Sequence, residues 1–130
     1  MSNSEELEKI CQKIIKLDPK MRSSRIINNR GHLVAGGMKK GLHSLEAQKQ
    51  DEMMFMELAL RVRMRHEFDK EFGVVHFSMS YRDKVIVMSF PLTGDDVLLV
   101  SCEKDINFGK IPFKILKLIE PLKNSPMKTF

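Results

Sequence analysis

The segment from Ser44 to Phe72 constrains the fold of this chain more than any other part of the sequence. Nine of the twelve residues from Met53 to Met64 are apolar. At 100° per residue, the predicted helix carries one narrow polar stripe, formed by Glu57, Arg61 and Arg65. The apolar arc covers roughly two-thirds of the circumference, whereas a stripe a little over 100° wide suffices for a helix on one sheet. The surplus predicts either a second layer of core or a contact with another molecule.

The residues before this helix predict a shorter helix and a hairpin. Apolar residues at helical spacing indicate a helix from about Ser4 to Leu17. A strand is expected over Arg22–Asn28, then a turn over Asn29–His32 and a second strand over Leu33–Gly36. Residues 37–44 should form an exposed loop, because they contain glycines and two adjacent lysines.

Three strands and a final helix should follow. Apolar and polar residues alternate from Val74 to Tyr81, which is typical of an edge strand. A second strand is expected over Val85–Phe90. The run Val97–Cys102 is the most apolar and should lie at the centre of the sheet, covered on both sides. The last helix should begin close to Lys110 and close at Glu120-Pro121. The order of elements is then α-β-β-α-β-β-β-α.

Length, charge and cysteine content limit the class of protein. The 130 residues suit a single domain over 1–122 with a flexible tail over 123–130. The net charge of +5 suits nucleic acid, anionic lipid or an acidic partner, and equally no charged partner. Cys11 and Cys102 lie in apolar runs, as expected of buried thiols in a reducing compartment. The N-terminus lacks the pattern of a signal peptide and no window approaches about 18 apolar residues, so we expect a cytoplasmic protein without a membrane span.

The stretch NRGHLVAGGM has the glycine spacing of a phosphate-binding loop but lacks its other residues. That motif places a lysine and then a hydroxyl residue after the second glycine, where this chain has Gly37 and Met38. We interpret Gly31 instead as the positive-φ residue of a hairpin turn. The four histidines show no HxxxH spacing, and neither cysteine looks exposed and electropositive. No catalytic residue, metal site or cofactor is therefore predicted.

The basic residues provide candidate contacts for anions. Lys39 and Lys40 lie in the loop, and Arg61 and Arg65 share a face of the long helix. Arg63 projects almost opposite to them. No exposed aromatic residues are interleaved to stack bases. The pattern disfavours nucleic-acid binding, which remains an alternative.

The order of elements and several segments resemble the Roadblock/dynein light chain domain, which is related to longin and profilin-like folds. The resemblance rests on the hairpin IINNRGHLVAGG, the helix MMFMELALRVRM and the strands VVHFSMSY, VIVMSF and VLLVSC. It covers about residues 5–120, and a small archaeal family without assigned function looks closer still. The resemblance implies an α+β fold with a five-stranded antiparallel sheet in the order 2-1-5-4-3. It places one long helix on one face and the terminal helices on the other.

The resemblance also implies a non-enzymatic homodimer that acts as an adaptor or regulator of a small Ras-like GTPase or another protein partner. The family pairs through its third strand and long helix. The corresponding interface residues are Met53, Met56, Leu60, Met64, Val75, Phe77, Met79 and Tyr81. One alternative is a profilin-type ligand-sensing domain, with a pocket between the sheet and the long helix lined by Phe55, Met79 and Met88.

Overall fold

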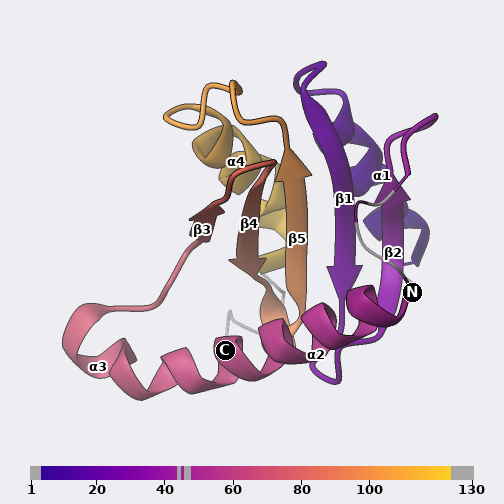
Figure 1. Ribbon diagram of the computed structural model, residues 1–130. Helices are drawn as coiled ribbons and strands as arrows, with labels where there is room; N and C mark the ends of the chain where they lie inside the picture. The colour runs from indigo at the N-terminus through magenta and orange to yellow at the C-terminus, as the bar shows by residue number, and fades with distance from the viewer. Residues whose placement is uncertain (1–3, 44, 46–47, 124–130) are drawn as a thin grey trace.

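The computed structural model describes residues 4–43, 45 and 48–123 (Figure 1). The expected tail beyond Lys123 and the expected helix start at Ser44 lie outside the described residues. The elements in chain order are α1 (Ser4–Ile15), β1 (Met21–Ile27), β2 (Leu33–Met38), α2 (Gln48–Arg65), the 3-10 turn η1 (His66–Phe68), α3 (Asp69–Phe72), β3 (Ser78–Tyr81), β4 (Ile86–Pro91), the 3-10 turn η2 (Thr93–Asp95), β5 (Val97–Cys102) and α4 (Ile111–Lys123).

The five strands form one antiparallel sheet in the order β2-β1-β5-β4-β3, which confirms the predicted order. α1 and α4 cover one face of the sheet (Figure 1). α2 crosses the other face, from the β2 side to beyond the β3 edge (Figure 1). The α+β class and the division of the helices between the two faces are therefore also as predicted.

Alternation of side chains along β5 divides the core into two layers. Leu98 and Val100 point to the layer of α1 and α4, where they cluster with Ile14 and Ile115 and are fully buried. Leu99 points the other way, toward α2. Both faces of β5 are thus covered, as its apolar sequence indicated.

α2 packs on the sheet with one apolar side and completes the layer that contains Leu99. Phe55 and Val62 pack with Ile27 and Leu99, and Ala59 on the same side of the helix is 2% exposed. Arg25 of β1 also lies under the start of α2. Its guanidinium carbon is 5.1 Å from the centre of the Phe55 ring, and its Nη1 is 3.5 Å from a carboxylate oxygen of Asp51. The other apolar face of α2 is open to solvent.

The described part of the long segment is helical as far as Phe72, as predicted, but it is not one continuous α-helix. α2 ends at Arg65, and η1 and the one-turn α3 follow. The two ring nitrogens of His66 each lie 2.8 Å from a carboxylate oxygen, one of Asp69 and one of Asp95 in η2. Because Asp95 lies 29 residues further along the chain, helical periodicity could not reveal this contact.

The predicted strand over Val74–Tyr81 was too long, because only Ser78–Tyr81 pairs as β3. Ser78 pairs with Ser89 of β4, so a longer β3 would bring residue 76 opposite Pro91. Proline has no amide hydrogen to donate to the ladder, which explains why pairing stops. β3 is therefore a short edge strand.

Other boundaries also differ from those predicted. β2 continues to Met38 because Gly36 and Gly37 still pair with β1. Pro121 does not close α4, which runs on to Lys123. The hydroxyl of Thr93 donates a hydrogen bond to the carbonyl oxygen of Leu122 at 2.7 Å, which satisfies one of the last carbonyls of that helix.

Candidate interaction surface on α2

Four apolar side chains form an exposed stripe along α2, here called the α2 stripe. They are Met53, Met56, Leu60 and Met64, with exposed fractions of 67%, 62%, 50% and 60%. Steps of three or four residues place all four on one side of a helix. Scattered exposed apolar residues are ordinary, but a continuous row of them marks an interaction site. The helix that the sequence predicted to have surplus apolar surface carries that surplus as an exposed stripe, which the described part of the chain does not cover.

The stripe passes next to the β1–β2 hairpin. Gly31 in this turn has φ +81°, as expected, and it leaves no room for a side chain. A Cβ atom there would lie 2.9 Å from both the backbone N and the Cα of Met56. The amide side-chain oxygen of Asn28 accepts hydrogen bonds from the backbone N–H groups of Arg30 and His32, which completes the turn. The glycine therefore allows α2 to lie close to the hairpin.

Two of the residues predicted for the interface lie on β3 but face away from the α2 stripe. Met79 is opposite Met88 in the ladder, on the side of the sheet that α1 and α4 cover. Tyr81 lies on the same side, with its ring centre 6.0 Å from that of Phe108. Both are exposed, at 39% and 61%. The backbone of β3 has β4 on one side and no strand of the described residues on the other.

The remaining two predicted interface residues precede β3. Phe77 is partly buried, with its ring centre 5.7 Å from that of Phe90 and 5.6 Å from that of Phe113. Val75 is partly exposed in the extended segment before the strand. The eight predicted residues thus divide into the α2 stripe on one side of the sheet and a β3 group at its edge.

The structure contradicts the predicted ligand pocket. Phe55 belongs to the layer between the sheet and α2. Met88 belongs to the opposite layer, and Met79 lies on that side as well. Since the sheet separates Phe55 from the two methionines, these side chains cannot line one cavity.

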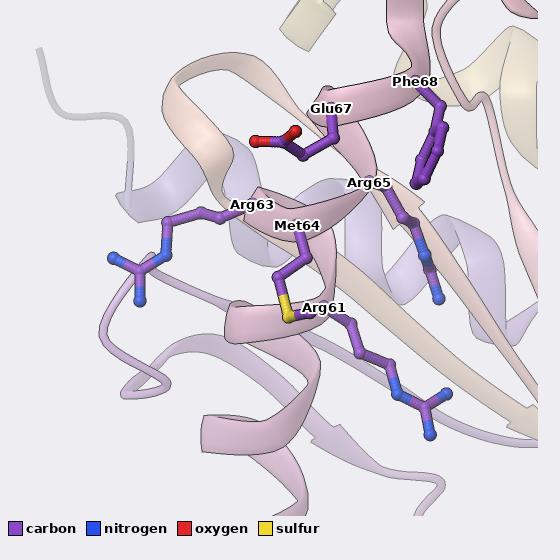
Figure 2. Close-up of a pocket in the computed structure, with 6 residues that line it drawn as sticks. All are labelled: Arg61, Arg63, Met64, Arg65, Glu67 and Phe68. Carbon is purple, nitrogen blue, oxygen red and sulfur yellow. The ribbon is translucent and has the colours of Figure 1, made fainter.

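An open hollow of about 650 Å³ lies at the C-terminal end of α2 (Figure 2). It is lined by Arg61, Arg63, Met64, Arg65, Glu67 and Phe68. Figure 2 shows Arg61 and Arg65 extending in the same direction and Arg63 pointing the opposite way, as predicted. Nη1 of Arg65 is buried without a hydrogen-bond partner among the described residues. Burial, followed by the charge of Arg61, lowers the pKa of Arg65.

The two lysines predicted as anion contacts are not part of this surface. Lys39 follows β2, and its Nζ donates a hydrogen bond to the carbonyl oxygen of Pro19 at 2.8 Å. Lys39 and Lys40 line a separate hollow of about 230 Å³ between α1 and β2. The end of β2 lies at the opposite corner of the molecule from the C-terminal half of α2 (Figure 1). The four basic residues therefore form no common track for a nucleic acid.

Sequence reasoning missed two polar contacts that position α2. Arg25 is 6% exposed and lies with Asp51 and Phe55 at the start of the helix. At the other end, the hydrogen bonds that the His66 ring donates to Asp69 and then to Asp95 raise the pKa of His66, because both carboxylates favour the charged imidazolium. The sequence signals only the first of these contacts. Arg25 interrupts an apolar strand, and Asp51 lies in the first turn of the long helix.

The sheet order and the helix placement define the Roadblock class of fold, and solved structures of that class superpose on this one. The Roadblock/LC7 domain from Streptomyces avermitilis is 12% identical, with a TM-score of 0.64, and the match covers 88% of this chain and 95% of that one. Myxococcus xanthus MglB is 12% identical, with a TM-score of 0.70 and coverage of 96% and 97%. A structure of MglB with a tetrameric arrangement is 9% identical, with a TM-score of 0.77 and coverage of 100% and 96%.

Residues 1–124 match a family model, and the chain belongs to that family, described as a family of unknown function, DUF6659. No curated protein matches the sequence. Among the described residues, none of the helices has the length and apolar character needed to cross a membrane.

Proposed function

We propose that the protein is a non-enzymatic, homodimeric adaptor or regulatory module, and that the dimer binds a protein partner of the small Ras-like GTPase class. The observation that carries the proposal is the α2 stripe. Its four side chains are at least half exposed, although they lie on the same helix as a well-buried apolar face. A second copy of the chain would cover them.

The α2 stripe and β3 together favour a symmetric pair. β3 is an edge strand of four residues, and edge strands present unpaired backbone groups that can pair with another chain. α2 extends beyond that same edge (Figure 1). A two-fold axis beside β3 would bring the two edge strands and the two α2 helices together in a single interface. The MglB neighbour with a tetrameric arrangement is an oligomer of the same fold, which supports the proposal by analogy.

The proposed class of partner rests on the resemblance to Roadblock domains, whose dimers serve small Ras-like GTPases. The proposal of a non-enzymatic role is supported by the two thiols, which are both buried. Burial raises the pKa of Cys11 to about 11 and that of Cys102 to about 12, so neither is a thiolate at neutral pH. Two such free thiols suit the reducing cytoplasm, where we also place the protein.

The proposal is tested in two steps. The molar mass of the wild type in solution should be about twice 15.1 kDa, and that of Met56→Glu should fall toward a single chain, because the substitution puts a charge into the buried interface. Small GTPases from the same organism, loaded with GDP or a GTP analogue, should then be retained by the immobilised wild type in one nucleotide state more than in the other. Equal and negligible retention of every GTPase would reject the partner class but leave the dimer in place.

A further inference from the structure

Lysines are concentrated on the outer side of the layer formed by α1 and α4. α1 and the residue after it carry three exposed lysines at spacings of four and three residues, and α4 and the residue before it carry three more at the same spacings. These residues, here called the six-lysine face, are Lys9, Lys13, Lys16, Lys110, Lys114 and Lys117. None of their ammonium groups has a hydrogen bond or an ion pair among the described residues. The six charges are therefore available to an external anion.

Helical spacing directs each set of three lysines away from the sheet. At 100° per residue, the lysines of one set lie within about 60° of one another around the helix axis. The buried residues Cys11 and Ile14 lie on the opposite side of α1, and Ile115 and Ile119 on the opposite side of α4. The two helices contact each other on the same face of the sheet (Figure 1), so both sets of lysines face the same way.

The connections to β1 and β5 place the two sets of lysines level with each other. Met21 at the start of β1 pairs with Cys102 at the end of β5, so α1 ends and α4 begins at the same end of the sheet. Lys16 and Lys110 therefore lie at that end, and the other four lysines follow within roughly 10 Å along the antiparallel helices. Packed helices lie about 8–10 Å apart. The six charges thus form a compact block rather than a line.

The acidic residues of the same helices lie outside this block or turn away from it. Glu5 and Glu6 are in the first turn of α1, and Glu120 is near the end of α4, so all three lie at the far end of the helical layer. The carboxylate of Glu8 accepts a hydrogen bond from the backbone N–H of Gly36 in β2 at 3.0 Å. The positive charge of the block is therefore not neutralised where Lys16 and Lys110 lie.

Exposed aromatic rings border the block at the end where α4 begins. Phe113, in the first turn of α4, is exposed, with its ring centre 5.6 Å from that of Phe77. Phe108, in the loop before α4, is exposed as well, with its ring centre 6.0 Å from that of Tyr81. Lys104 adds a further cation, since its Nζ lies 4.8 Å from the centre of the Tyr81 ring. Lysines beside exposed aromatic side chains are typical of surfaces that lie on anionic membranes.

The composition of the block favours a lipid surface over a nucleic acid. All six residues are lysines, whereas arginine is the residue whose planar group binds a phosphate with two hydrogen bonds. A lysine is attracted by the field of an anionic surface without a fixed geometry, so a compact block of lysines suits many headgroups at once. The neighbouring phenylalanine rings gain from burial at the boundary between headgroups and acyl chains, which a nucleic-acid backbone does not offer.

We infer that the six-lysine face docks the protein on an anionic phospholipid membrane, with the lysines over the headgroups and Phe108 and Phe113 at the boundary with the acyl chains. The face lies across the sheet from α2, so the membrane-bound protein presents the α2 stripe on the side away from the lipid (Figure 1). The inference does not depend on the proposed homodimer, because every residue in it belongs to a single chain and lies on the other side of the sheet from that stripe.

The test is co-sedimentation of the full chain with vesicles of phosphatidylcholine, either alone or with about one-third phosphatidylglycerol, in about 0.1 M salt. The wild type should sediment with the anionic vesicles, stay in solution with the neutral ones, and be released as salt is raised. Each lysine near an anionic surface contributes about fivefold in affinity. The variant that combines Lys13→Gln, Lys16→Gln, Lys110→Gln and Lys114→Gln should therefore bind the anionic vesicles at least about 100-fold more weakly.

The matched control removes the same charge from exposed positions on the β1–β2 hairpin, α2 and α3. It combines Arg30→Gln, Lys49→Gln, Arg63→Gln and Lys70→Gln and should bind the anionic vesicles within a few-fold of the wild type. Equal loss of binding in the two variants, both with native circular dichroism, would overturn the inference, and so would a wild type that binds neither kind of vesicle. Binding to a DNA duplex but not to the vesicles would overturn it in favour of a nucleic-acid partner.

The aromatic border has a separate readout because the chain contains no tryptophan. In Phe108→Trp, the single indole should shift its emission to shorter wavelength on the anionic vesicles, since it moves from water to the boundary with the acyl chains. Unchanged emission from the vesicle-bound variant would overturn the placement of residue 108 in the lipid. The oligomeric state of the protein affects none of these outcomes, so they are distinct from the tests of the proposed homodimer.

Discussion

Replacing Leu60 by alanine should weaken the dimer without unfolding the protomer. Leu60 is 50% exposed in the single chain and lies in the middle of the α2 stripe. Burial of a whole leucine side chain contributes about 1.5–3 kcal/mol, so burial of the exposed half in an interface contributes about 1 kcal/mol per protomer. A two-fold interface loses this contribution twice, or about 2 kcal/mol, which is about a 30-fold rise in the dimer Kd.

Leu33→Ala is the matched control for this substitution. Leu33 is also 50% exposed, but it lies on β2 at the other edge of the sheet. The dimer Kd of both variants and of the wild type can be measured by sedimentation equilibrium, with thermal unfolding of each variant as a check on the protomer. If Leu60→Ala changes the Kd no more than Leu33→Ala does, the α2 stripe is not the interface and the reasoning from exposure fails.

Three predictions concern the contacts that position α2. Gly31→Ala should lower the free energy of unfolding in urea by about 2–3 kcal/mol, because the turn requires positive φ and the new Cβ would meet the backbone of Met56. Unchanged stability would show that the hairpin can move away from α2. Asp51→Asn should lower the free energy of unfolding by up to about 3 kcal/mol in the same assay, because it removes the carboxylate charge that lies 3.5 Å from the buried Arg25 guanidinium; a loss below about 0.5 kcal/mol would show that this contact contributes little. His66→Asn should lower stability by up to about 1 kcal/mol below pH 6.5, since the group is solvent-exposed. The pKa of His66 is raised in the folded protein, so the stability that His66 contributes is complete below its unfolded pKa and is lost as pH rises through its folded pKa. A stability difference between the wild type and His66→Asn that grows at high pH would contradict this.

Periodicity along the chain predicted the layers of the fold because burial follows it directly. The continuous apolar run of β5 predicted the central strand that the structure shows, and the wide apolar arc of α2 predicted more apolar surface than the sheet covers. The positive φ of Gly31 followed from its place in the turn, but its proximity to Met56 did not, because nothing local indicates which helix passes a hairpin. Likewise, the sequence did not indicate which apolar side of α2 packs on the sheet. In the structure Phe55 and Val62 point inward, which leaves the α2 stripe exposed.

The features that sequence reasoning missed depend on residues far apart in the chain. α2 gives way to a 3-10 turn where His66 contacts Asp95, and no local pattern contains that contact. β3 is short because Pro91 stands opposite the extension of the strand, which requires the exact ladder register. The predicted pocket was wrong because alternation along a strand does not indicate which face of the sheet its apolar residues lie on. Met79 lies on the face away from α2.

Sedimentation equilibrium of the unmodified protein, over concentrations up to about 100 µM, tests the central claim most directly. The proposed homodimer predicts a mass that rises with concentration to about twice 15.1 kDa and goes no higher. A mass that stays at 15.1 kDa across the whole range would contradict the proposed homodimer. The α2 stripe would then not be covered by a second copy of the chain.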